Sequence, residues 1–198
     1  FYYSQQSKGS GGAALKLVVK DHLQVDGKIS MNGEEGARYY RAYHTYEHYG
    51  VGGGAAGSIW IMTRSLGGVG TIAADGGKGG QGANTGYDGG GGGGGRIAVG
   101  CATPLQGSAR FQGKITASGG LPYRRDSHTN APGSAGIVFE ENCRSVSRTV
   151  TVASDHGRNN PFGSSDLFRS EKSARVFFDT VVVQDNQRLF LMGPPRTA

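Results

Sequence analysis

The chain has 198 residues, of which 37 are glycine, and it carries a formal net charge of +6 at pH 7. A composition with so much glycine and only 36% hydrophobic residues indicates low complexity when the apolar residues are scattered, but here they are grouped in short strands. The basic residues are spread out and lack interleaved aromatics, so nucleic acid is not expected as a partner. No stretch approaches the roughly 20 apolar residues that a membrane span requires, so no membrane span is expected.

Two series of short apolar strands recur along the chain. The first comprises Leu15-Lys16-Leu17, Ile59-Trp60-Ile61, Ile97-Ala98-Val99 and Ile137-Val138-Phe139. The second comprises Gly27-Lys28-Ile29, Gly70-Thr71-Ile72 and Gly113-Lys114-Ile115, with the isoleucines 43 residues apart. We expect Val181-Val182-Val183 to continue the first series, and Val150-Thr151-Val152 and Leu189-Phe190-Leu191 to continue the second. Alternation of apolar with other residues is the period of a strand.

A repeat near 40 residues indicates units that bury their apolar face only by stacking on their neighbours. Like strands that stack in this way run parallel. We therefore predict an all-β fold, a parallel and right-handed β-helix (β-solenoid) of about five rungs with stacked glycine-rich excursions. The repeat continues throughout, so residues 1–198 are expected to form a single β-solenoid domain, and the absence of capping ends suggests a mature segment or fragment of a longer protein.

Glycine-rich excursions occupy equivalent places in successive repeats, at residues 33–57, 76–95 and 118–136. In isolation, such a composition reads as a flexible linker. However, the glycines stand next to strand starts in copy after copy, which indicates close backbone approach of a kind that only glycine permits. We therefore predict that these glycines pack side by side: Gly52, Gly53, Gly54, Gly89, Gly90, Gly91, Gly92, Gly93, Gly94 and Gly95.

The two cysteines, Cys101 and Cys143, are 42 residues apart, close to one repeat. Adjacent strands lie about 4.8 Å apart, and disulfide Cα atoms are typically about 4.4 to 6.8 Å apart. A disulfide between adjacent rungs is therefore expected, with two free thiols or a link to another chain as alternatives. Such a disulfide indicates an oxidising, extracellular setting.

Few residues offer catalytic chemistry. His44 and His48 have the spacing of a zinc motif, but Glu47 is on the wrong side for a zincin and no third ligand follows. The outward strand positions carry no row of carboxylates such as polysaccharide hydrolases use. Three aspartates beside glycines offer cation ligands but are more typical of turns: Asp75, Asp88 and Asp126. We therefore expect no enzyme activity, no metal and no cofactor.

An aromatic segment interrupts the repeat, and it is predicted to be a contact loop together with the outward-facing Trp60. Tyrosine and tryptophan are favoured in protein–protein contacts. The predicted contact residues are Tyr39, Tyr40, Tyr43, Tyr46, Tyr49 and Trp60. Self-association is the expected partner contact, and stacking on the rings of a glycan is the alternative.

Several strings occur in a fixed order: GGGAAGSIWI at 52–61, GTIAADGG at 70–77, GGGGGRIAV at 91–99, GKITASGG at 113–120 and GSAGIVFE at 133–140. They resemble the glycine-rich repeat arrays of large secreted and cell-surface proteins of protists and bacteria, including proteins of flagellar hairs (mastigonemes). The resemblance covers residues 13 to about 192 and departs from the pattern at residues 39–49 and 155–172.

The resemblance implies an extracellular structural protein, a subunit or segment of a cell-surface filament or hair that assembles by lateral and end-to-end contacts. A carbohydrate-binding adhesin or inactive polysaccharide-lyase-like β-helix is the alternative.

Overall fold

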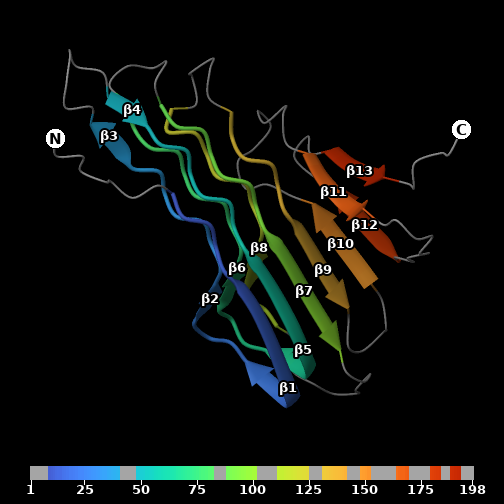
Figure 1. Ribbon diagram of the computed structural model, residues 1–198. Helices are drawn as coiled ribbons and strands as arrows, with labels where there is room; N and C mark the ends of the chain where they lie inside the picture. Colours follow the sequence, from blue (N-terminus) through green and yellow to red (C-terminus); the bar gives the residue numbers. More distant parts are fainter. Residues whose placement is uncertain are drawn as a thin grey trace, which may run out of the picture.

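The computed structural model describes residues 9–40, 48–82, 88–101, 111–124, 131–141, 148–152, 164–169, 179–183 and 188–192. These residues form strands and extended segments, with no helix among them. Figure 1 shows long strands lying side by side in one sheet, shorter strands behind them, and undulating glycine-rich segments that continue the strands at one end. The described residues are therefore strand-rich and compatible with the predicted all-β class, whereas a closed β-helix stays a prediction.

The larger sheet has six strands. In spatial order they are β1 (Ala14–Gln24), β5 (Ser58–Gly67), β7 (Arg96–Cys101), β9 (Ile137–Glu141), β10 (Arg148–Val152) and β12 (Thr180–Val183). Neighbours run parallel except β9 and β10, which run antiparallel. Most of this sheet therefore has the parallel pairing that the repeat predicts, and β12 occupies the sheet to which its valines were assigned.

The second sheet has three parallel strands, β2 (Lys28–Ser30), β6 (Thr71–Ala73) and β8 (Lys114–Thr116). Its register aligns Ile29 with Ile72 and Ile72 with Ile115, as their 43-residue spacing predicts. Two further pairs stand apart from these sheets: the antiparallel β3 (Arg38–Tyr40) and β4 (His48–Gly50), and the parallel β11 (Ser164–Arg169) and β13 (Arg188–Met192).

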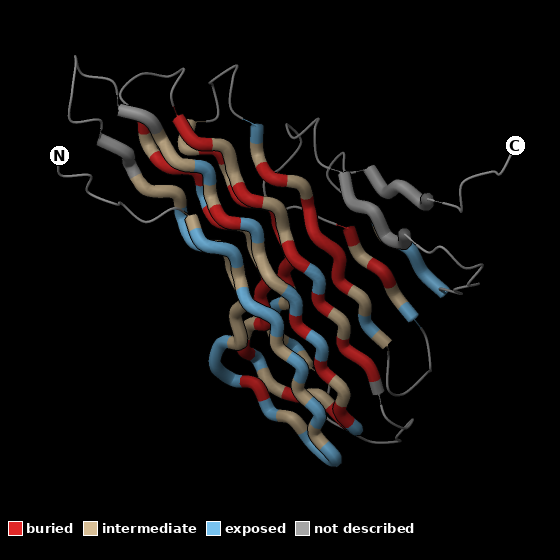
Figure 2. Tube along the Cα trace, viewed as in Figure 1, coloured by how far each residue is buried: buried red, intermediate tan, exposed pale blue. Residues whose placement is uncertain are grey.

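The main core lies between the two sheets. Every second residue of β5 is buried, including Ile59 and the fully buried Ile61, and these side chains pack in one cluster with Ile72 and Ile97. Figure 2 shows the resulting alternation of buried and less buried residues along the strands. This alternation places Trp60, which lies between Ile59 and Ile61, on the outward face of the sheet.

The glycine segments are joined by backbone hydrogen bonds that recur at every third residue. Gly54 N donates to Glu34 O and Gly57 N to Met31 O, so residues 51–57 run antiparallel to residues 31–37. On another side, Gly53 N donates to Gly90 O and Ala56 N to Gly93 O, so residues 51–57 run parallel to residues 88–95. Three residues per turn is the period of a polyproline II helix, which has no internal hydrogen bonds and exposes all its backbone groups to neighbours.

Close approach in this layer requires glycine at the positions that face a neighbour. A Cβ added at Gly92 would lie 2.0 Å from the Gly54 carbonyl oxygen, and one at Gly53 would lie 2.0 Å from the Gly77 oxygen. Since the obstacle is backbone, no side chain can move to make room. Gly52 and Gly93 differ, because the nearest atoms to an added Cβ there are 3.8 and 3.5 Å away.

Three expected strand placements are wrong. Val150-Thr151-Val152 lies in β10 of the six-stranded sheet and not in the smaller one, because only residues 142–147 separate it from β9. A parallel neighbour needs a crossover of roughly a dozen residues, whereas an antiparallel neighbour does not. Leu189-Phe190-Leu191 lies in β13, which pairs with β11.

The third error is the register of β9, where Ile97 pairs with Val138 and Ile137 pairs with Arg96. Residues Ile137-Val138 are apolar without alternation and both are buried, on opposite faces of the strand. Periodicity therefore could not show which residue faces which side.

Candidate functional site

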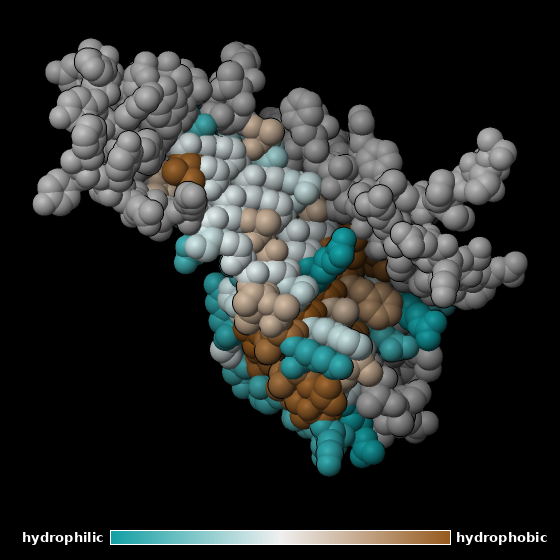
Figure 3. Space-filling view, viewed as in Figure 1, coloured by the Kyte–Doolittle hydropathy of each residue, from teal (hydrophilic) through white to brown (hydrophobic). Residues whose placement is uncertain are grey.

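A row of residues crosses the outward face of the six-stranded sheet. Pairing aligns Lys16 on β1, Trp60 on β5, Ala98 on β7 and Phe139 on β9. Trp60 is 47% exposed, and Val18 beside this row is 64% exposed. Figure 3 shows hydrophobic side chains gathered over the strands of this sheet, crossed by hydrophilic ones, whereas the glycine segments present a nearly neutral surface. We call this surface, from Lys16 to Phe139, the Trp60 face.

The Lys16 ammonium lies over the indole ring of Trp60, with Nζ 4.4 Å from the ring centroid. At exposed sites such a cation–π contact is worth about 0.5 to 1 kcal/mol. No described residue accepts a hydrogen bond from the Trp60 indole N–H, so this donor remains available. The contact arises because β1 and β5 place the two side chains directly opposite each other on one face of the sheet.

Two of the cations on this face have acidic partners. Arg64 Nη1 lies 3.9 Å from Asp21 Oδ1, and Arg148 Nε lies 3.3 Å from Glu141 Oε1. By contrast, no described carboxylate pairs with Arg96, which is exposed and stands opposite Ser58 on the neighbouring strand. Lys16 also lacks a carboxylate partner among the described residues. The Trp60 face therefore joins an exposed aromatic ring to uncompensated positive charge.

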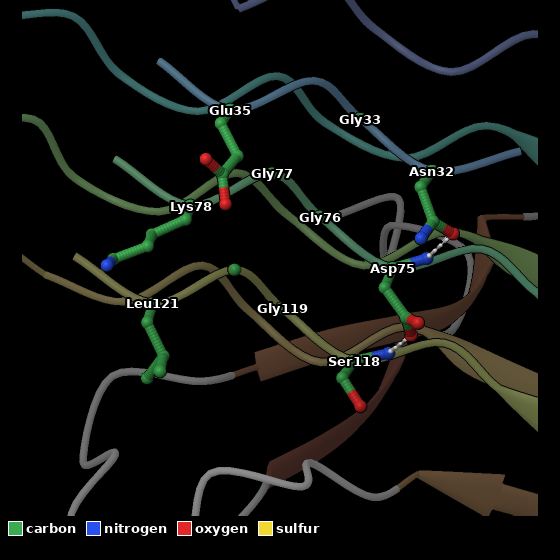
Figure 4. A pocket seen from close by; sticks show the side chains of 11 residues that line it. Asn32, Gly33, Glu35, Asp75, Gly76, Gly77, Lys78, Ser118, Gly119 and Leu121 are labelled. Carbon is green, nitrogen blue, oxygen red and sulfur yellow. Dashed lines mark hydrogen bonds between the residues drawn. The ribbon is translucent and has the colours of Figure 1, made fainter. Parts of the chain in front are cut away.

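A second group of polar residues lies where the three-stranded sheet passes into the glycine segments (Figure 4). Asp75 N donates to Asn32 Oδ1 at 2.9 Å, and Ser118 N donates to Asp75 Oδ1 at 2.8 Å. Asp75 Oδ2 accepts from the Thr116 hydroxyl at 2.9 Å. The Asn32 and Asp75 side chains thus each bond the backbone of the next repeat. These residues also line a shallow groove, so the polar groups at this groove have a structural role.

The two described aspartates that offered cation ligands have other roles. Both carboxylate oxygens of Asp75 accept hydrogen bonds, as above. The fully buried Asp88 accepts from Gly82 N at 2.7 Å, and its Oδ2 lies 3.5 Å from Arg124 Nε, an ion pair without hydrogen-bond geometry. A guanidinium so close disfavours a bound cation. Asp126 lies outside the described residues.

The predicted contact residues fall into separate places. Tyr39 and Tyr49 are directly opposite each other in the β3–β4 pair, where Tyr40 pairs with His48. Tyr43, Tyr46, His44 and Glu47 lie outside the described residues. Trp60 belongs to β5, and residues 51–57 of the glycine layer separate it from β4. The tyrosines of β3 and β4 therefore belong to a different part of the molecule from Trp60.

The predicted disulfide stays a prediction. Cys101 ends β7 and pairs in register with Thr63 of β5, whereas Cys143 lies outside the described residues. Lys16 and Arg96 were not singled out from the sequence as site residues, and Asp75 was singled out only as an aspartate beside glycines, without Asn32 and Ser118. A signal existed for this row of three polar residues, because its members are 43 residues apart and each follows an aligned isoleucine by three residues.

In comparisons with known proteins, no family model, no curated protein and no solved structure matches this chain. The resemblance to glycine-rich surface arrays therefore stays a prediction. In the described part of the chain, no helix is long and apolar enough to cross a membrane. Nor do three His, Cys, Asp or Glu side chains gather within that part in a way that would hold a metal ion.

Proposed function

We propose that this chain is a structural segment of an extracellular filament or surface hair, in which successive repeats stack as a parallel β-solenoid. One observation carries the proposal: backbone hydrogen bonds run from each repeat to the next in every layer. The register of β2, β6 and β8 is one example, and the bonds from Gly33 N to Asp75 O and from Gly76 N to Ser118 O are others. Bonds aligned along one axis share a load applied along that axis.

An open edge supports end-to-end growth. Among the described strands, β1 pairs only with β5, and β2 pairs only with β6. Ser58 N donates to Ala13 O at 3.1 Å, and backbone groups in a strand point alternately to its two sides. Lys16 and Val18 therefore direct their N–H and C=O groups away from β5. An exposed edge of this kind is a template for another strand.

In this proposal a further repeat adds at the β1 edge, and the β3–β4 pair with its tyrosines supplies lateral contacts. The test uses the whole chain with Val18→Pro, which removes an edge N–H while leaving the bonds to β5 in place; proline is tolerated on edge strands. Val18→Thr is the matched control, because it keeps the N–H and a β-branched side chain.

Sedimentation velocity over a range of concentrations, with electron microscopy of the same samples, measures assembly. We expect the unmodified chain and Val18→Thr to form filaments as concentration rises, and Val18→Pro to sediment as a monomer with an unchanged melting temperature. A chain that remains monomeric up to about 1 mM, an affinity of only about −4 kcal/mol, contradicts the proposal.

A further inference from the structure

On the Trp60 face, a residue with a small side chain stands beside an exposed aromatic ring. Trp60, Ala98 and Phe139 stand on three successive strands, in register. Adjacent strands lie about 4.8 Å apart, so the backbone positions of the two aromatic residues are about 9.6 Å apart. The residue between them in the register is Ala98, whose side chain is a single methyl group and therefore apolar and small.

Positive charge lies on both sides of the Trp60 position. Lys16 lies against the indole ring at 4.4 Å, and Arg96 stands two residues from Ala98 on the same strand and the same face. The nearby acidic groups are already engaged, Asp21 with Arg64 and Glu141 with Arg148. A ligand that brings its own negative charge would therefore gain an attraction that no described carboxylate supplies.

We propose that the Trp60 face binds an acidic polysaccharide, a polymer of sugar rings that carry carboxylates. The face of a pyranose ring is lined with C–H groups, which pack against the negative face of an aromatic ring. The carboxylate of a uronic acid accepts charge-assisted hydrogen bonds from Lys16 and from Arg96, whose guanidinium suits a carboxylate in a bidentate arrangement. The indole N–H, which has no acceptor among the described residues, provides a further donor to a sugar hydroxyl.

Single-stranded nucleic acid also combines rings with negative charge, but the distribution of charge on this face fits it less well. A nucleic-acid strand needs cations that follow its backbone along a groove. Here the unpaired cations Lys16 and Arg96 lie on the two strands next to that of Trp60. The next positions on this face along β1 and β5 are the apolar Val18 and Met62, and the exposed Lys20 lies beyond Val18. One charged sugar unit on one ring matches this arrangement better than a row of phosphates.

The experiment titrates the full chain with polygalacturonate oligomers and follows the fluorescence of Trp60, the single tryptophan in the sequence. The matched ligand control is the same oligomer with its carboxylates methyl-esterified. We expect a change in Trp60 emission with the acidic oligomer, and at least about tenfold weaker binding of the ester.

Calorimetry with variants locates the site. We expect Trp60→Ala to weaken binding at least about tenfold and Arg96→Gln about fivefold, whereas Trp60→Tyr retains most of the affinity. Arg64→Gln is the matched control, because this arginine lies on the same face but is paired with Asp21. It should change binding less than about twofold. Melting temperatures of all variants verify the fold.

The proposal is overturned by no binding of polygalacturonate up to about 1 mM, by equal binding of the ester, or by equal losses from Arg64→Gln and Arg96→Gln. Tighter binding of single-stranded oligothymidylate with the same dependence on Trp60 also overturns it, and identifies a nucleic-acid surface. Polysaccharide binding does not depend on filament assembly. If binding fails, the proposed structural role still stands or falls with the sedimentation experiment.

Discussion

The two sheets and the glycine layer belong to the same repeats but are held together by different interactions. Between the sheets, isoleucines such as Ile61 and Ile72 are fully buried, and hydrophobic burial supplies about 1.5 to 3 kcal/mol for each such side chain. In the glycine layer, neighbouring segments meet through backbone hydrogen bonds, and many of the positions that face a neighbouring backbone are glycines. Each such bond contributes a net of only about 0.5 to 1.5 kcal/mol.

The two regions share one repeat length but differ in which side chains they accept. In the sheets, side-chain volume and alternation decide whether a residue fits. In the glycine layer, what matters is whether a residue faces a neighbouring backbone, and this changes with a period of three. Conservative changes of apolar side chains should therefore be tolerated in one region, and any added side chain should be rejected at specific positions in the other.

The largest expected effect is in amide exchange, which separates an ordered glycine layer from a flexible linker. Gly92 N donates to Gly77 O at 2.9 Å and Gly95 N to Ala74 O at 2.8 Å, whereas no described acceptor bonds the amides of Gly90 and Gly93. We expect the bonded amides to exchange on the order of a thousandfold more slowly than Gly90 and Gly93, as measured by NMR. Uniformly fast exchange over residues 88–95 contradicts the ordered layer.

Substitution of adjacent glycines is the next largest effect and tests the three-residue rule. Gly92→Ala would place Cβ 2.0 Å from the Gly54 oxygen, and we expect it to destabilise the fold by about 3 kcal/mol. Gly93→Ala meets only the Ser134 hydroxyl oxygen at 3.5 Å, and should be neutral or stabilise the fold by about 0.5 kcal/mol. Urea unfolding compares the two, and equal effects would mean that the layer does not pack as described.

The smallest expected effect is the loss of stability on substitution of Asp75, which lies where the three-stranded sheet passes into the glycine layer. Asp75→Ala leaves the Ser118 N–H and the Thr116 hydroxyl without the carboxylate that accepts from both, and we expect a loss of about 2 kcal/mol. Asp75→Asn keeps one acceptor oxygen and should lose about 1 kcal/mol or less. Urea unfolding measures both losses, and faster exchange of the Ser118 amide in the alanine variant locates them. An alanine variant as stable as the original chain would mean that the hydrogen bonds of Asp75 do not stabilise the junction.

Much of the sheet architecture could be predicted from spacing, because the isoleucines Ile29, Ile72 and Ile115 repeat at a constant step and each packs in or against the core. The order of β9 and β10 could not, since apolar alternation is the same in parallel and antiparallel strands. The register at Ile137 failed for a related reason, because the strand is buried on both faces and shows no alternation there.

The candidate site was only partly predictable. Trp60 was expected to face outward, but its contact with Lys16 and its place beside Arg96 depend on the register between neighbouring strands. Asp75 was interpreted as a residue of a turn because it precedes glycines. Its actual partners, Asn32 and Ser118, are distant in sequence and share only the repeat spacing.

The three-residue period of the glycine layer also limits how this protein can change length. Insertion of one residue into a segment such as 88–95 turns all following residues by a third of a turn, which brings a solvent-facing position against a neighbouring backbone. Insertion of three residues restores the same face and lengthens the segment by about 9 Å. The length of the layer can therefore change only in steps of three residues. Length variants that still fold should differ by a multiple of three residues, and by the same multiple in every segment.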